Sequence, residues 1–327
     1  MEPPTLTGFG ALNLDLFFEV EDLGLIALGE RRLKPGEEYS GSEEDFQYIL
    51  TQLNRIGTLK SRSGGGSAAN TTFALAQMGF PTKFIGNVGN DEEGDFILNS
   101  LGPVQTGLIH RDQCTGVCLV VLDRHHDRFL FLRGNANNTL SLDGISMETL
   151  RDASWIHLSS FIDELPFEAQ KDLVNRLDPA VKVSMDPGEI YARKGLGKLS
   201  PLIQRCHILF LTEKEVTLLT ARDLHSGVRA LLEAGPKILV CKRGSQGSQV
   251  FTERGDFEVP ARPVTVVDNT GAGDVYNAGF LAGFFLRSPL EVCALFATEV
   301  ASKSVTGYGR TCYPNREDFE YFFGAGL

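Results

Sequence analysis

The stretch VVDNTGAGDVYNAGF, residues 266–280, decides the fold. It places Gly271, Ala272 and Gly273 directly before Asp274 and then begins an apolar helix. Backbone N–H groups at a helix start carry partial positive charge, so this turn predicts a site for a phosphate or a developing oxyanion. Asp274 either favours the positive end of the helix or has a chemical role, and this stretch alone leaves both open.

The totals describe an ordinary globular chain. It has 327 residues, 42% of them apolar and 22% charged, which allows one large α/β domain or two smaller ones. The formal net charge of −11 argues against general nucleic-acid binding, which needs basic surface. No apolar run reaches the ~20 residues of a membrane span. The acidic first segment lacks the basic start of a signal peptide, so we expect a cytoplasmic protein without a membrane partner.

Short apolar runs alternate with longer helical patterns along the chain. The runs are rich in β-branched residues and nearly continuous in apolarity, as in strands buried on both faces, and they lie at 83–88, 155–160, 181–186, 207–212 and 237–241. The helical patterns occupy 68–79, 226–236 and 275–286. This alternation predicts a mostly parallel sheet covered by helices on both faces.

Two regions interrupt the alternation. The first, about 14–62, is charged and irregular at its centre, and the second, 117–134, has the pattern of two strands joined by a polar turn. Together they could form a small sheet beside the main one. A cover over a pocket and a plain surface feature are both compatible with this pattern.

A second glycine-rich stretch, SRSGGGSAANTTF, spans 61–73. A flexible linker is one interpretation, but a helical pattern begins at once and the composition does not change across the stretch. Gly65 and Gly66 allow close backbone approach to a ligand, and the amide of Asn70 suits hydroxyl groups. Contact with a ligand is therefore the favoured interpretation.

Two further segments follow predicted strands. In LTEKEV, 211–216, the acids Glu213 and Glu215 lie at the carboxyl end of a strand, where open α/β sheets bind ligands and where a carboxylate beside a phosphate often organises Mg²⁺ through water. An acidic helix start explains them equally simply. CKRGSQGSQVF, 241–251, has the pattern of strand, turn and strand, which an ordinary hairpin also explains.

The order of these motifs carries a resemblance. GALNLD near the start, GGGSAAN, LTEKE, CKRGSQG and DNTGAGD together resemble the ribokinase-like carbohydrate kinase family, also called the phosphofructokinase-B family. The resemblance covers essentially the whole chain. It implies a single domain over 1–327, a three-layer α/β/α fold with a mostly parallel central sheet, and a small β lid from parts of 14–62 and 117–134. It also implies transfer of the ATP γ-phosphoryl group to a hydroxyl.

The resemblance implies roles for individual residues. The base that takes the hydroxyl proton is Asp274, beside an anion hole of Gly271, Ala272 and Gly273. The contacts to acceptor hydroxyls are Asn13, Asp15, Gly65, Gly66 and Asn70. The residues on the nucleotide side are Thr212, Lys242, Gly244, Gly247 and Thr270. Glu215 matches the glutamate that organises Mg²⁺ through water.

The chain departs from the family pattern at three places. Thr212 stands where the family's Asn-x-x-Glu motif begins with asparagine, which puts the Mg²⁺–water network in doubt. Asn269 stands where the last motif usually has threonine. The family's glycine-alanine ending is GYGR, residues 307–310. None of these changes touches Asp274, so we still expect activity.

The acceptor is less determined than the reaction. The tight spacing of Asn13 and Asp15 favours a small sugar, whereas the long segment 14–62 resembles the lid of adenosine-kinase-like members, so a nucleoside is the alternative. Phe17 and Phe18 could stack on a base or pack in the lid. A non-catalytic binder on the same scaffold is a third reading, against which an intact Asp274 argues. A homodimer through lid strands is also expected.

Overall fold

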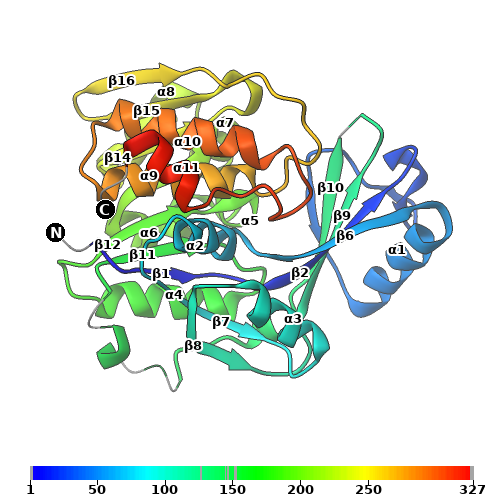
Figure 1. Cartoon of the computed structure of the whole chain (residues 1–327). Coiled ribbons are helices and arrows are strands. Elements are labelled where there is room, and N and C mark those ends of the chain that lie inside the picture. Colours follow the sequence, from blue (N-terminus) through cyan, green and yellow to red (C-terminus); the bar gives the residue numbers. More distant parts are fainter. Residues whose placement is uncertain (1–2, 126, 144, 146, 151–152, 325–327) are drawn as a thin grey trace.

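A nine-stranded sheet forms the centre of the protein (Figure 1). The structure, a computed structural model, describes residues 3–125, 127–143, 145, 147–150 and 153–324. The strand order is β16-β15-β14-β13-β12-β11-β1-β7-β8. In chain order these strands are β1 (Leu6–Phe9), β7 (Thr82–Val88), β8 (Gln105–Arg111), β11 (Trp155–Ser159), β12 (Lys182–Asp186), β13 (Cys206–Thr212), β14 (Ile238–Lys242), β15 (Ser248–Thr252) and β16 (Gly255–Val259).

Every pairing from β8 across to β14 is parallel, and only β15 and β16 at one edge run antiparallel. All five strands expected from the sequence are present in this sheet, which confirms the mostly parallel α/β fold. The stretch 241–251 turns through a short 3₁₀ helix, η4 (Gly244–Gln246), between β14 and the antiparallel β15.

Helices cover both faces because side chains along each buried strand alternate between them. Ile208 and Phe210 of β13 pack with α2, α9, α10 and α11, whereas Leu209 and Leu211 pack with α4, α6, α7 and α8 on the other face. The helices are α2 (Ser67–Gln77), α3 (Glu92–Ser100), α4 (Glu164–Arg176), α5 (Gly188–Ala192), α6 (Gly195–Arg205), α7 (Glu213–Thr220), α8 (Leu224–Ala234), α9 (Ala272–Phe285), α10 (Leu290–Ser304) and α11 (Arg316–Phe323). Further 3₁₀ turns are η1 (Leu23–Leu25), η2 (Asn135–Thr139) and η3 (Met147–Leu150).

A second sheet stands beside the first, with α1 (Glu43–Ile56) on its outer side (Figure 1). Its strand order is β5-β10-β9-β2-β6. These strands are β2 (Asn13–Glu19), β5 (Glu38–Ser40), β6 (Thr58–Gly65), β9 (Gly116–Leu122) and β10 (Arg128–Arg133), and a small ladder joins β3 (Ala27–Leu28) to β4 (Arg31–Arg32). The expected hairpin over 117–134 is the antiparallel pair of β9 and β10. That this sheet acts as a lid stays a prediction.

The second sheet has its own apolar core. Phe46, Ile49 and Leu53 of α1 pack against Phe129 and Phe131 of β10. Phe18 belongs to the same cluster, and Phe17 lies on the other side of β2 with its ring edge against Tyr308, 6.2 Å between centroids. Both phenylalanines are buried, so the packing interpretation is confirmed over base stacking. The strand β6 lies at one edge of this sheet, and the expected homodimer through lid strands stays a prediction.

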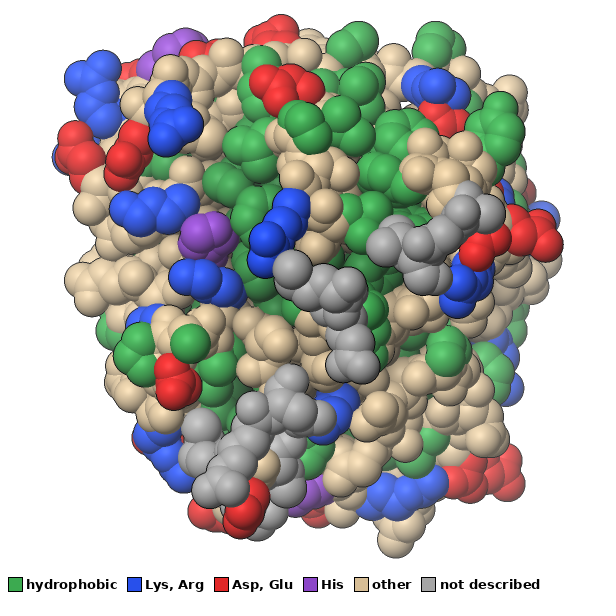
Figure 2. Space-filling view, turned by 60° about the vertical axis from the view of Figure 1, so that its left-hand side comes forward, with side chains coloured by type: hydrophobic (Ala, Val, Ile, Leu, Met, Phe, Trp, Pro, Cys, Tyr) green, Lys and Arg blue, Asp and Glu red, His purple; other side chains and the backbone are tan. Residues whose placement is uncertain are grey.

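Charged side chains of both signs surround an apolar centre on the face drawn in Figure 2. Among the coloured residues on that face, no continuous basic surface of the kind that nucleic acids need is visible. No helix in the part of the chain that the structure describes combines the length and the apolarity needed to cross a membrane.

The contact between α9 and the sheet should contribute strongly to the stability of the fold. Phe280 of α9 is fully buried and meets Phe210 of β13 edge to face, with 5.8 Å between ring centroids. We expect Phe280→Ala to lower the free energy of unfolding by about 3–5 kcal/mol, because it removes a large buried ring and leaves a cavity. Urea unfolding measures this change. The control Leu295→Ala, at a side chain 50% exposed on α10, should stay within about 0.5 kcal/mol of wild type. If both variants lost the same free energy of unfolding, the contact between Phe280 and Phe210 would not be a major source of stability.

Candidate active site

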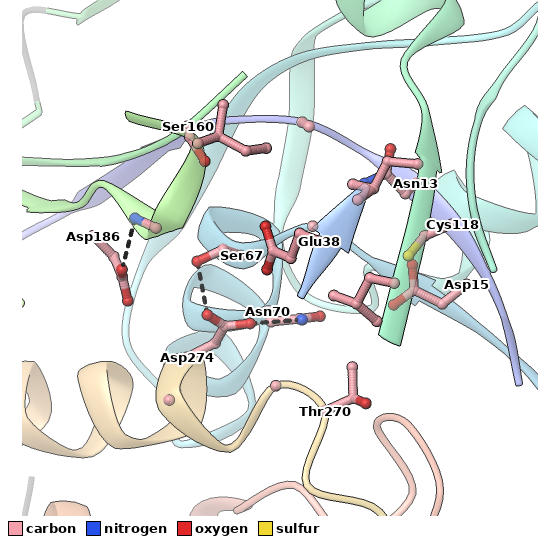
Figure 3. Close-up of a pocket in the computed structure, with 18 of the residues that line it drawn as sticks. Asn13, Asp15, Glu38, Ser67, Asn70, Cys118, Ser160, Asp186, Thr270 and Asp274 are labelled. Atoms are coloured by element: carbon pink, nitrogen blue, oxygen red, sulfur yellow. Dashed lines mark hydrogen bonds between the residues drawn. The ribbon is translucent and has the colours of Figure 1, made fainter. Parts of the chain in front are cut away.

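A cavity of about 240 Å³ lies between the carboxyl ends of the main strands and the second sheet (Figure 3). Parallel strands present their carboxyl ends on one edge, where α/β sheets bind ligands. Asp186 ends β12, Lys242 ends β14, and Glu215 lies in the first turn after β13. The predicted site residues that line this cavity are Asn13, Asp15, Gly66, Asn70, Glu215, Lys242, Thr270, Gly271, Gly273 and Asp274.

Asp274 joins the two glycine-rich stretches. The hydroxyl of Ser67 donates to its Oδ1 at 2.7 Å, and Nδ2 of Asn70 donates to its Oδ2 at 2.9 Å (Figure 3). The hydroxyl of Thr71 donates to its backbone oxygen at 3.1 Å. Neither Ser67 nor Asn70 caps α2, whose N-cap is Gly66 without a side-chain bond. The carboxylate of Asp274 therefore faces α2 rather than the N–H groups of its own helix.

The surroundings of Asp274 bring its ionisation close to neutral pH. Burial raises the pKa of Asp274 to about 6, and the nearby charge of Asp186 acts in the same direction. The hydrogen bonds from Asn70 and Ser67 oppose this rise, because they stabilise the ionised form. The carboxylate is thus mostly ionised at pH 7 and close to the point where it takes up a proton.

The turn before Asp274 requires glycine. Gly271 has φ 78°, and a Cβ there would lie 2.2 Å from the hydroxyl oxygen of Tyr313. A Cβ on Gly273 would lie 3.2 Å from Nζ of Lys242. Of the expected anion hole of Gly271, Ala272 and Gly273, the N–H of Ala272 is already engaged, because it donates to the carbonyl of Asn269 at 3.3 Å. A tight turn inside the motif consumes that donor.

A buried ion pair lies beside this turn. Lys242 pairs with Asp186, which also accepts from Nδ2 of Asn277 at 2.7 Å. Burial opposes charge on both groups, but their attraction outweighs it: the pKa of Asp186 is lowered and that of Lys242 is raised. Lys242 lines the cavity that Asp274 also lines. It does not lie with Gly244 and Gly247, with which the sequence analysis grouped it, because these two glycines line a different cavity.

Thr212 and Glu215 form a capping box at the start of α7. Thr212 N–H donates to Oε2 of Glu215 at 2.7 Å, and Glu215 N–H donates to Oγ1 of Thr212 at 3.2 Å. Thr212 does not line this cavity, so its contribution is to fix Glu215. Burial raises the pKa of Glu215, and the charge of Asp186 adds to the rise. The acidic-helix-start explanation and a ligand role are both compatible with this geometry.

The N-terminal site residues meet at the second sheet. Nδ2 of Asn137 donates to Oδ1 of Asn13 at 2.9 Å, and burial raises the pKa of Asp15 to about 8. Gly65 does not line the cavity; a Cβ there would lie 2.1 Å from the carboxylate of Asp15. Gly66, with φ 103°, would bring a Cβ to 2.0 Å from the carbonyl of Ala11. The absence of a side chain at both glycines makes room for neighbouring groups of the protein. The sequence analysis had explained these glycines only by the close approach of a ligand.

A second cavity of about 610 Å³ adjoins the first. Gly244, Gly247 and Ala272 line it, together with apolar side chains that include Val264. Asn269 lines both cavities, so the glycine turn of the last motif separates them. Thr270 lies on the first side, where its backbone N–H donates to Oδ1 of Asp268 at 2.8 Å.

Sequence reasoning missed several residues of the site. Asp186 could have been noticed as the acidic last residue of a predicted strand, at the edge where open α/β sheets bind ligands. Ser67 lies within the glycine-rich stretch 61–73, but the sequence analysis assigned it no role in the site. Glu38 and Arg128 reach the cavity from β5 and β10, and Arg128 donates to Asn269; no local pattern marks either residue.

The chain matches the family model of the pfkB family carbohydrate kinases over residues 42–316. It belongs to this family and is a sugar or nucleoside kinase with the ribokinase-like fold.

Three similar proteins illustrate the range of this family. An uncharacterized sugar kinase of Archaeoglobus fulgidus is 33% identical over 243 residues, 72% of this chain and 95% of that protein. A nucleoside kinase of Methanothermobacter thermautotrophicus is 27% identical over 249 residues, 75% of this chain and 79% of that protein. The structure of an Arabidopsis thaliana ribokinase with ribose and ATP has a TM-score of 0.75 and 25% identity, covering 98% of this chain and 99% of that one.

The raised pKa of Asp274 predicts a pH-dependent effect on stability. A carboxyl group whose folded pKa lies above its unfolded value stabilises the fold below the unfolded pKa, and this stabilisation is lost as pH rises through the folded pKa. Relative to Asp274→Asn, wild type should therefore be less stable at pH 8, by about 3 kcal/mol, and the gap should close between about pH 6 and pH 4. Thermal unfolding at several pH values measures it. A gap that does not change with pH would contradict the burial of this charge.

Proposed function

We propose that the protein transfers the γ-phosphoryl group of ATP to a hydroxyl of a small sugar, with Asp274 as the general base. The observation that carries this proposal is the geometry of Asp274. Its carboxylate lies in a cavity at the start of α9, held by Ser67 and Asn70, beside a glycine turn and Lys242. A carboxylate that only favoured the helix dipole would need neither donor.

The acceptor side supports a polyhydroxyl compound. Asn13 and Asp15 project from β2 into the cavity, and Asn137 fixes the amide of Asn13. The carboxyl of Asp15 has no hydrogen-bond partner among the described residues, which leaves both of its oxygens for ligand hydroxyls. The names of the sugar kinase from Archaeoglobus fulgidus and of the plant ribokinase agree with such an acceptor.

A nucleoside is the second candidate, and one observation favours it. Partly exposed apolar side chains from both sides line the same cavity: Leu130 and Leu132 of β10, with Ile162 and Ile190 of the main domain. Apolar walls suit the flat aromatic base of a nucleoside better than they suit a polar sugar. The nucleoside kinase relative agrees with this alternative.

The second cavity fits a nucleotide. Its glycines Gly244 and Gly247 leave backbone exposed, and its apolar lining suits an adenine ring. The phosphates would then reach the first cavity past Asn269 and Thr270, toward the N-terminus of α9, whose partial charge favours anions. Thr212 would act only indirectly, through Glu215.

A magnesium ion also fits, held mainly through water. The described residues contain no group of three acidic, His or Cys side chains arranged to bind a metal directly. Glu215 and Asp186 nevertheless line the cavity with carboxylates, and Mg²⁺ commonly keeps several waters and binds through one or two carboxylates and the phosphates. When bound, the ion would neutralise charge on the phosphates.

The reaction follows from these positions. The acceptor oxygen forms a bond to the γ-phosphorus, the bond to the β-phosphate oxygen breaks, and ADP leaves. The proton of the attacking hydroxyl passes to the carboxylate of Asp274. Lys242 and the free N–H groups of the glycine turn stabilise negative charge on the transferred group.

The cytoplasmic location expected from the sequence stays a prediction.

An ATP-consumption assay with a panel of sugars and nucleosides tests the proposal. We expect a sugar to be the best acceptor, and Asp274→Asn to lower kcat by at least ~100-fold while the folded variant still binds ATP and acceptor. A folded Asp274→Asn variant with ordinary kcat would exclude Asp274 as the base. Preference for a nucleoside would keep the reaction and replace the acceptor.

The role of Glu215 has a separate test. Glu215→Gln keeps the shape of the capping box but removes the charge, so the Mg²⁺ concentration at half-maximal rate should rise roughly tenfold or more, with little change in the KM for the acceptor. Titration of the rate with Mg²⁺ measures this. Glu213→Gln, on the neighbouring acid that pairs with Arg243 at 2.8 Å, is the matched control. Identical Mg²⁺ curves for wild type and Glu215→Gln would remove the metal role.

A further inference from the structure

The departure GYGR at 307–310 places an arginine beneath the active site. Nε of Arg310 donates to Oδ1 of Asn70 at 3.0 Å, and its guanidinium lies 4.8 Å from the ring centroid of Phe73. Arg310 lines neither of the two cavities above, so it does not contact the ligands that they would hold. It instead contacts the back of a residue that holds Asp274.

The turn that carries Arg310 is anchored, and its guanidinium is buried. Its turn is anchored to the last motif, because Gly309 N–H donates to Oδ2 of Asp268 at 3.1 Å. Its Nη1 and Nη2 atoms are buried and have no hydrogen-bond partner among the described residues. A buried guanidinium with two unpaired nitrogens is costly, which makes a purely structural role a poor explanation.

The bond from Arg310 decides how the amide of Asn70 is oriented. An amide has one acceptor oxygen and one donor nitrogen, so a donor at Oδ1 turns Nδ2 the other way. Nδ2 points to Oδ2 of Asp274 at 2.9 Å (Figure 3). With the amide reversed, Asn70 would present its oxygen to a carboxylate oxygen, which is repulsive. Arg310 therefore secures one of the two side-chain donors on Asp274.

The charge of Arg310 also acts on the acceptor side. Asp15 is buried, which raises the pKa of its carboxyl, and Arg310 is the group that opposes this rise, whereas Asp268 and Asp274 add to it. The other group that faces Arg310 is the phenol of Tyr313. The positive charge of Arg310 thus interacts with two carboxyl groups that line the cavity, those of Asp15 and Asp274.

We propose that Arg310 is a positioning residue for phosphoryl transfer: by donating to Oδ1 of Asn70, it orients the hydrogen bond that Asn70 donates to Asp274. This inference rests on the proposed function of the site. It gives the departure from the family ending a role in this chain. The charge of Arg310 also acts on Asp15, where it opposes the rise in pKa that burial causes.

Kinetics on four variants test the path through Asn70. Arg310→Met should lower kcat roughly tenfold or more, since it removes a charged hydrogen-bond donor. In an Asn70→Ala background the same change should alter kcat by less than about twofold, because the residue it acts through is gone. An equal loss in both backgrounds would overturn the path. Arg62→Met, at an exposed arginine 5.1 Å above the ring of Phe96, is the control and should leave kcat unchanged.

The charge effect has a readout that does not need activity. In protein labelled with ¹³C at aspartate carboxyls, the resonance missing from Asp15→Asn belongs to Asp15. Its pKa should rise in Arg310→Met and stay at the wild-type value in Arg62→Met and Arg310→Lys, because lysine keeps the charge. Arg310→Lys should not recover kcat, because an ammonium lacks the planar Nε donor. If the pKa of Asp15 does not change in Arg310→Met, the charge of Arg310 does not act on Asp15.

These outcomes distinguish a failure of the proposed function from a failure of the role assigned to Arg310. Wild-type protein that transfers no phosphoryl group to any acceptor would refute the proposed function, while the Asp15 titration would still decide whether Arg310 acts on Asp15. An active wild type with an Arg310→Met variant that loses only melting temperature would refute the inference and leave the proposed function intact.

Discussion

The hydrogen bonds from Ser67 and Asn70 to Asp274 hold the site together. They join residues 207 and 204 positions apart and link the start of α2 to the start of α9. Burial favours the neutral carboxyl, whereas the two donors favour the ionised form. The balance of these effects gives a carboxylate that is ionised near neutral pH yet able to accept a proton, which is what a general base requires.

The rest of the fold supports this link. The parallel sheet brings the carboxyl ends of β12 and β14 together, so that Asp186 and Lys242 form a buried pair beside the glycine turn. That pair places a positive charge near Asp274 without leaving it unpaired in the interior. The second sheet covers the cavity from the other side and contributes Asn13, Asp15 and Arg128. The first cavity is therefore formed by both sheets, and the glycine turn borders both cavities.

Much of the fold could be predicted because it depends on local patterns. Apolar runs such as 207–212 identified the buried strands, and the polar turn between β9 and β10 identified the hairpin. Asp274 and Asn70 belonged to recognisable motifs. Asp186, Glu38 and Arg310 did not, because each matters only through a partner that the fold brings near. Gly65 was found for an incomplete reason: its missing Cβ makes room for Asp15, a fact that only the three-dimensional contact reveals.

The pH dependence of kcat in Ser67→Ala tests whether the ionisation of Asp274 controls the reaction. At saturating ATP and acceptor, the account predicts that wild-type kcat falls as pH drops through about 6, where Asp274 becomes protonated. Loss of the Ser67 hydrogen bond disfavours the ionised form, so in Ser67→Ala this fall should begin at higher pH. An acidic limb at the same pH in both proteins would mean that Asp274 is not the group whose ionisation controls the reaction, and would contradict the account.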